Sequence, residues 1–190
     1  MPYELINSLA SVGTFVVIAA SAIAALIQLR HVRTSNQIAL MTKLHDTLQT
    51  PDFLAARRFV AYELTSMLED PVVREQLRHP PFEGRMAAVG LLGNFFENSG
   101  LLVRRGILDR EMVCEVWGGI IVQTWYQVDG VLGVMRSQPG GGDIWENFEY
   151  LAVIAEDWLA RHPGGDYPKG YRRMTLPMLP APRHAERVEA

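Results

Sequence analysis

An uninterrupted apolar run near the N-terminus limits this chain more than any other feature of its sequence. The stretch from Leu5 to Leu29, LINSLASVGTFVVIAASAIAALIQL, contains no charged side chain. A bilayer hydrocarbon core about 30 Å thick is crossed by roughly 20 apolar residues, each contributing about 1.5 Å of helical rise. Length and composition therefore predict a transmembrane helix over residues 1–30.

Two other interpretations of the apolar run fit less well. A secretory signal needs a basic N-terminal region, whereas MPYE contains Glu4 and no basic side chain. Ala22-Ile23-Ala24 fits a small-x-small cleavage pattern, but apolar or uncharged residues and then Arg30 follow it directly. A buried core helix seldom runs this long without a charge. We therefore expect an uncleaved single span.

The charges that flank the apolar run predict its orientation. Arg30, Arg33 and Lys43 follow it, whereas Glu4 precedes it. Basic residues are retained on the cytoplasmic side. We therefore expect a single-pass protein of the cell inner membrane with its N-terminus outside and its bulk in the cytoplasm. The lone Cys114, which has no second cysteine to pair with, agrees with this placement.

Polar and small residues recur along one side of the predicted span. Their spacings alternate between four and three residues, through Ile18, which aligns them on one helix face. Helices associate in lipid through small residues that permit close approach and through polar side chains that bond across the contact. An alternative is that the hydroxyls bond their own backbone. The pattern predicts a helix-association face, for a second copy or another membrane subunit, made of Asn7, Ser11, Thr14, Ser21, Ala25 and Gln28.

The rest of the chain is expected to be all-α, because apolar residues recur at helical spacing and strand-like alternation is not evident. The span should continue as a stalk that carries Met41, Leu44 and Leu48 on one face. A small helical bundle should follow, so that residues 31–162 form a cytoplasmic helical domain. Residues 163–190 contain Gly, Pro and isolated arginines, which predict an extended tail.

Cap residues predict where individual helices begin and end. Thr50-Pro51 and Asp70-Pro71 each place a capping side chain before a proline at the first helical position. Gly106 should end one helix and Asp109 should cap the next. That next helix is apolar on nearly every face between residues 116 and 126, so it should be central, with Gly118 and Gly119 permitting close approach. We expect the last helix to begin with a capping pair formed by Asp143 and Glu146.

The last three predicted helices carry a family resemblance. The segments FFENSGLLVRRGILDREMVCEVWGGIIVQTWYQVDGVLGVMR and WENFEYLA combine a Phe-Glu pair, a Gly-capped turn, two tryptophans on one helix, an arginine at its end and a Phe-Glu-x-Leu helix. This pattern resembles a bacterial domain-of-unknown-function family of single-pass membrane proteins with a small helical cytoplasmic domain. The resemblance extends over roughly residues 1–160. It implies the topology and implies no activity.

Motifs for catalysis or cofactor binding are not evident. The sequence has no phosphate loop, no dinucleotide fingerprint, no nucleophile elbow, no Cys-x-x-Cys and no His-Glu-x-x-His. A di-iron bundle needs Glu-x-x-His pairs, and no histidine stands three residues after a glutamate. The formal net charge of −3 indicates no general attraction to nucleic acid. We expect no cofactor, no metal and no catalytic residue.

Two carboxylates and two tryptophans within apolar helices are the remaining candidates for a site. Glu97 and Glu149 could be functional acids if they were buried alone. We prefer ion pairs with Arg136 or Arg104, which would join helices. Trp117 and Trp125 could line a ligand pocket, but rings eight residues apart on one central helix are more often core.

These observations favour a membrane-anchored, noncatalytic interaction or accessory subunit of a homo- or hetero-oligomeric membrane complex, in contact with lipid and with itself or another subunit. The alternative is a membrane-tethered effector or enzyme that acts on a small molecule or lipid headgroup in a cleft of the last three helices. A cleft that holds Glu97 or Glu149 unpaired would favour the alternative.

Overall fold

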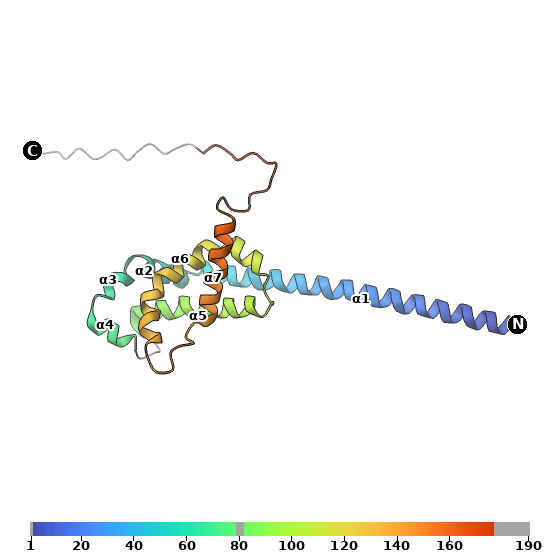
Figure 1. Cartoon of the computed structure of the whole chain (residues 1–190), viewed down its shortest axis with the longest axis horizontal. Helices are drawn as coiled ribbons and strands as arrows, with labels where there is room; N and C mark the ends of the chain where they lie inside the picture. The colour runs from blue at the N-terminus through green and yellow to red at the C-terminus, as the bar shows by residue number, and fades with distance from the viewer. Residues whose placement is uncertain (1, 79–81, 177–190) are drawn as a thin grey trace, which may run out of the picture.

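The computed structural model describes residues 2–78 and 82–176, except for the side chains of residues 2 and 4–11. All regular structure in these residues is helical, which confirms the all-α prediction. A long N-terminal apolar helix leads into a helical bundle (Figure 1). In chain order the elements are α1 (Pro2–Leu48), α2 (Pro51–Tyr62), α3 (Leu64–Met67), α4 (Pro71–Gln76), the short 3-10 helix η1 (Gly84–Met86), α5 (Ala87–Arg104), α6 (Arg110–Arg136) and α7 (Glu146–Arg161).

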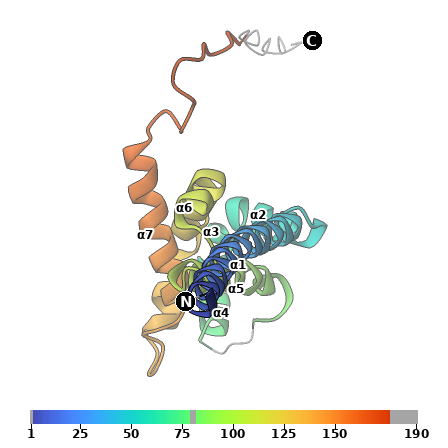
Figure 2. The ribbon, with the colours of Figure 1, turned by 90° about the vertical axis from the view of Figure 1, so that its right-hand side faces the viewer.

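Helix α1 runs through the predicted span and the stalk without a break. Its 47 residues correspond to a length of about 70 Å. The N-terminal half projects away from the bundle, whereas the C-terminal end lies against it (Figures 1 and 2). Met41 and Leu48 are buried there, and Leu44 packs against the same core. The stalk is therefore part of the folded domain.

Helices α5, α6 and α7 form the centre of the bundle. Both α5 and α6 pack along α7, and α2 packs on α5. Aromatic rings join these helices. The Phe53 and Phe95 ring centroids lie 4.9 Å apart, Phe96 stacks on Phe148 at 4.9 Å, and Trp125 meets Phe148 edge-on at 5.1 Å. This aromatic core fixes the start of α7 relative to α2, α5 and α6.

Helix α6 is less enclosed than its sequence predicts. Val116 and Tyr126 are each 55% exposed, because α2, α5 and α7 do not surround the helix. The expected close approach at Gly118 and Gly119 is also wrong. A Cβ at Gly119 would meet nothing within 4 Å, and one at Gly118 would meet Leu159 at an ordinary 3.6 Å.

Most of the predicted helix boundaries are confirmed by hydrogen bonds. The side chains of Thr50, Asp70 and Asp109 accept from backbone amides in the first turns of α2, α4 and α6, at 3.4, 2.8 and 2.9 Å. Gly106 follows α5 with a positive φ of 66°. The cap residues therefore act locally, as their sequence positions indicate.

The predicted capping pair at the start of α7 does not form. The N-cap position is occupied by Trp145, a non-glycine residue with φ of 54° and ψ of 39°, and its side chain makes no cap hydrogen bond. Glu146 instead turns toward Arg104. The Glu146 amide donates to the Asp143 carbonyl, and the next two amides of α7 obtain their acceptor from another helix.

The part of the predicted tail that the structure describes, residues 163–176, contains no helix. It folds back on itself at Arg173, whose Nη2 donates to the Gly164 carbonyl at 2.6 Å. The Arg173 guanidinium also lies 4.8 Å from the Tyr167 ring centroid. The remainder of the predicted tail, residues 177–190, lies outside the described residues.

Candidate functional site

The N-terminal half of α1 is an uncovered apolar surface. We call residues 12–29 the bare segment. Its large side chains are widely exposed, for example Val17 at 65%, Ile18 at 62% and Leu26 at 62%. By length and composition α1 can cross a membrane, and no residue of its most apolar window is buried in the fold. Such a helix is compatible with a membrane anchor or with a signal sequence.

One other helical stretch passes the same test of length and composition. It runs over Gly84–Arg104 and includes α5, but half of its apolar window is buried inside the bundle. Val89, Leu92 and Phe96 are almost completely buried against the neighbouring helices. This stretch is therefore the core helix of the bundle, and the bare segment is the candidate for membrane contact.

The helix-association face predicted from the sequence lies largely on the bare segment. Thr14, Ser21, Ala25 and Gln28 are all exposed in the single chain. The side chains of Asn7 and Ser11 lie outside the described residues. The role of this face in association stays a prediction.

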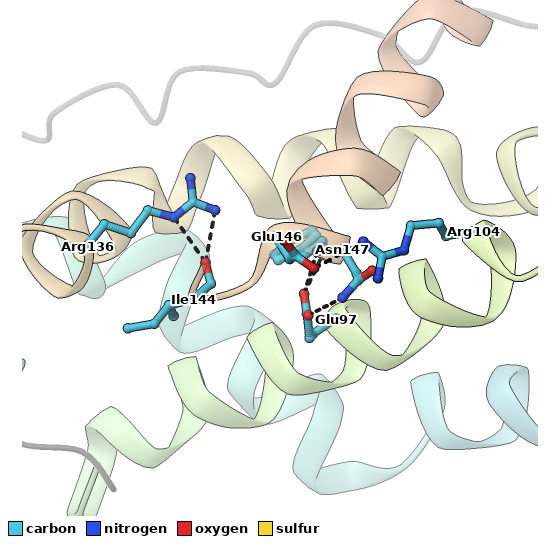
Figure 3. Close-up of polar contacts among 7 residues, drawn as sticks. Glu97, Arg104, Arg136, Ile144, Glu146 and Asn147 are labelled. Carbon is cyan, nitrogen blue, oxygen red and sulfur yellow. Dashed lines mark hydrogen bonds and ion pairs between the residues drawn. The ribbon is translucent and has the colours of Figure 1, made fainter. Parts of the chain in front are cut away.

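Glu97 holds the start of α7 from the neighbouring helix α5 (Figure 3). Its Oε2 accepts from the backbone amides of Asn147 and Phe148, both at 2.9 Å. Its Oε1 accepts from the Asn147 side-chain amide at 2.5 Å. The free amides at a helix N-terminus carry a partial positive charge that favours a carboxylate. Glu97 thus caps α7 in place of a residue within α7.

The arginines considered as partners for Glu97 bind other groups. Arg104 pairs with Glu146, with Nη1 and Oε1 3.1 Å apart. Arg136 pairs with Glu149, with Nη1 and Oε2 2.6 Å apart, and donates through Nε and Nη2 to the Ile144 carbonyl. Figure 3 shows Arg136 at Ile144 and Arg104 on the opposite side of Glu97. No ion pair of Glu97 is found among the described residues, because the α7 amides occupy its carboxylate.

Two glycines of α5 permit the contact with α7, and neither is predicted from the sequence to do so. A Cβ at Gly93 would stand 2.0 Å from the Trp145 ring, and one at Gly100 would stand 2.0 Å from the Asn147 carbonyl oxygen. Asn94 accepts from the Trp145 indole Nε1 at 3.1 Å. We call these five residues, with Glu97 and Phe148, the α5–α7 joint. The seven-residue spacing of the two glycines, which places them on one face of α5, is the sequence feature that could have indicated this close contact.

The two tryptophans of α6 differ in burial. Trp117 is 5% exposed and belongs to the core, where its Nε1 finds no hydrogen-bond partner among the described residues. Trp125 is half-buried, meets Phe148 edge-on and lies close to the Arg136 guanidinium, whose carbon stands 6.0 Å from the ring centroid. Both rings therefore pack within the bundle.

The thiol of the single cysteine, Cys114, has low reactivity because it is buried. Cys114 is 1% exposed, and burial raises the pKa of its thiol from 9.0 to about 11, with a smaller contribution from the nearby Glu111 carboxylate. The thiolate is the reactive form of cysteine. At neutral pH the buried thiol is therefore protonated and unreactive.

An apolar groove beside the α5–α7 joint has few groups for chemistry. It has a volume of about 610 Å³ and is lined by apolar side chains, Gly90 and one amide, Asn94. Neither Glu97 nor Glu149 is among its lining residues. Among the described residues, no group of three or more His, Cys, Asp or Glu side chains could hold a metal ion.

We expect Glu97→Ala to lower the free energy of unfolding by about 1–3 kcal/mol, because three donors at the α7 N-terminus lose their acceptor. Glu97→Gln keeps an acceptor oxygen and should cost less. Denaturant unfolding of the full chain in mild detergent, followed by circular dichroism, measures the difference. Glu115→Ala, an exposed glutamate on α6, is the control. Equal stability of Glu97→Ala and Glu115→Ala would contradict the capping role.

Comparison with protein families gives a match over most of the chain. The profile of a family described as Domain of unknown function (DUF4760) matches residues 15–158. The match covers most of the bare segment, the stalk and the bundle. No match is found among curated proteins or among solved structures.

Proposed function

Because the chain belongs to the family described as Domain of unknown function (DUF4760), we propose a function from its own residues: a membrane-anchored, noncatalytic interaction or accessory subunit of a homo- or hetero-oligomeric membrane complex. In this proposal residues 1–30 span the cell inner membrane with the N-terminus outside. Residues 31–162 form the cytoplasmic helical domain. The partners are membrane lipid and either a second copy or another membrane subunit.

The exposed apolar surface of the bare segment is the main observation that supports this proposal. Its apolar side chains are contiguous along α1, and nothing in the described part of the chain covers them. Soluble monomers rarely expose continuous apolar surfaces of this size. Lipid covers most of such a helix favourably, and a second helix can cover the polar face without unbonded groups.

The use of the acidic side chains supports a noncatalytic role. Glu97 caps α7 and Glu149 pairs with Arg136, so the two candidate acids hold helices together. The thiol of Cys114 is buried and neutral. A cleft with an open, unpaired Glu97 or Glu149 would have favoured the alternative effector or enzyme.

Purification in mild detergent with mass measurement of the particle tests the proposal. We expect a particle that contains two or more protein chains, either identical copies or this chain with another membrane protein. The interaction should persist at the lowest detergent concentration that keeps the protein soluble. A particle of one chain in detergent, with no crosslinked species in membranes, would contradict the proposal.

The predicted orientation has its own test. We expect a reporter that is active only in the cytoplasm to work when it is fused after Ala190, because Arg30 and Arg33 retain their flank inside. A reporter that is active only outside the inner membrane should be silent at the same site. The reverse pattern would show that the C-terminal side is translocated.

A further inference from the structure

A hydrogen bond joins the turn between α5 and α6 to the part of α1 that directly follows the predicted span. Arg33 Nη2, on α1, donates to the Gly106 carbonyl at 3.2 Å. Gly106 is 73 residues further along the chain. In Figure 1 this turn lies at the end of the bundle from which the N-terminal half of α1 emerges. The position of the turn along the axis of α1 is therefore fixed at the level of Arg33.

The distance of Arg33 from the end of the apolar run matches the depth of the headgroup layer of a bilayer. Arg33 is four residues beyond Leu29, which ends the apolar run, and four residues of helix rise about 6 Å. A bilayer is about 40–45 Å thick with its headgroups and about 30 Å without them, so each headgroup layer is roughly 5–8 Å deep. If residues 1–30 span the membrane, Arg33 and the Gly106 carbonyl both lie within this layer.

The turn has the side chains that suit this location. Ile107, at its tip, is 49% exposed although it is apolar. Arg105 is also exposed, and no carboxylate pairs with it among the described residues. Four other arginines lie on α1 close to the Arg33 bond or at the two ends of the turn, and three carboxylates lie on or are paired to the same segments. The four arginines are Arg30, Arg33, Arg104 and Arg110, and the carboxylates are Asp109, Glu111 and Glu146.

With Arg105 itself, five arginines stand against three carboxylates, so the segment carries net positive charge, and each carboxylate already has a partner. Asp109 caps α6 by accepting from the Met112 amide at 2.9 Å. Glu111 lies 3.2 Å from Arg110, and Glu146 lies 3.1 Å from Arg104. The excess charge comes from the arginines of α1 and from Arg105. Basic side chains near a membrane surface are attracted to anionic lipid, and an apolar side chain beside them gains from insertion at the acyl boundary.

We propose that the α5–α6 turn is a second membrane contact, in which Arg105 binds the phosphates of anionic phospholipids and Ile107 enters the headgroup layer. This inference rests on the proposed membrane anchorage of α1. It assigns the bundle a fixed orientation against the membrane. The opposite end of the bundle, near α3 and α4, then faces the cytoplasm and is free for a protein partner.

Site-directed spin labelling of the full chain tests this contact. Labels are placed one at a time on a Cys114→Ala background at Ile107→Cys, at Ile18→Cys in the bare segment and at Val72→Cys on α4, which is 65% exposed. The protein is reconstituted in phosphatidylcholine vesicles with and without phosphatidylglycerol. Relaxation by oxygen, which concentrates in lipid, is compared with relaxation by a water-soluble nickel complex.

In vesicles with phosphatidylglycerol we expect position 107 to be several-fold less accessible to the nickel complex than position 72, and position 18 to be accessible mainly to oxygen. Equal nickel accessibility at positions 107 and 72, with position 18 in lipid, would overturn this inference and leave the anchor intact. Nickel accessibility at position 18 would overturn the proposed anchor as well.

A charge reversal separates anionic lipid from general membrane proximity. Arg105→Glu should raise the nickel accessibility at position 107 in vesicles with phosphatidylglycerol. Arg58→Glu, an exposed arginine on α2, is the matched control and should change nothing. Protection that is the same with and without phosphatidylglycerol, and that survives Arg105→Glu, would overturn the role of anionic phosphate.

Discussion

Trp117→Ala is expected to lower the free energy of unfolding of the helical domain by about 3–5 kcal/mol, the usual cost of removing a large buried ring. Trp117 is 5% exposed and belongs to the core of the bundle. Unfolding of the full chain in mild detergent, monitored by circular dichroism, measures the loss. Trp125→Ala should cost less, because part of that ring is already in contact with solvent.

Two variants show whether the loss comes from packing. Trp117→Phe keeps an aromatic ring and removes a buried N–H that has no acceptor in the described part of the chain, so it should cost clearly less than Trp117→Ala. Val116→Ala, next to it and 55% exposed, should change the free energy of unfolding by no more than about 0.5 kcal/mol. Normal melting of Trp117→Ala would place the ring outside the core and make it a candidate for ligand contact.

The sequence predicts well those parts of the fold that depend on neighbours along the chain. A cap residue such as Asp109 acts on an amide three residues away, so its effect can be derived from spacing alone. The unbroken continuation of α1 into the stalk follows from the lack of Pro and Gly between residues 30 and 49. The same reasoning places Gly106 at the end of α5.

The start of α7 could not be derived in this way, because its acceptor comes from α5. Glu97 is 50 residues before Asn147 in the chain, and only the packing of the two helices brings them together. Within the local sequence Asp143 and Glu146 are better cap candidates, yet Trp145 adopts a left-handed conformation there. Such a conformation is costly for a large residue and persists only when its surroundings enforce it. The contact with Gly93 and the bond to Asn94 supply that enforcement.

Exposure on α6 was missed for a related reason. A helix that is apolar on every face is fully buried only if enough neighbouring helices surround it, and the periodicity of a sequence does not give the number of neighbouring helices. In this bundle α2, α5 and α7 leave Val116 and Tyr126 uncovered. The Tyr126 hydroxyl donates to Glu156 of α7 at 2.7 Å, so its polar end is engaged while its ring stays at the surface.

Replacing Thr14, Ser21 and Ala25 together with leucine is expected to abolish or strongly reduce association of the chain in membranes. These three positions lie within about 40° of one another around α1, at about 100° per residue, and all are exposed in the single chain. Leucine keeps the span apolar enough for insertion but fills the space that lets two backbones approach. Hydrogen bonds between spans contribute only about 0.6–2 kcal/mol each, so single substitutions would be masked. Particle mass in detergent and crosslinking yield in membranes measure the loss.

The matched control places leucine at Val16, Ala19 and Ala20, which lie on the opposite side of the same helix turns. It also adds bulk in the middle of the span, so any general effect of larger side chains on insertion or expression appears in both variants. We expect the control to associate like the unaltered chain. Loss of association only in the first variant would make the polar face of the span part of the interface. Equal association of both variants would reduce the span to a tether, and the exposed end of the bundle near α3 and α4 would then be the surface on which to seek a partner.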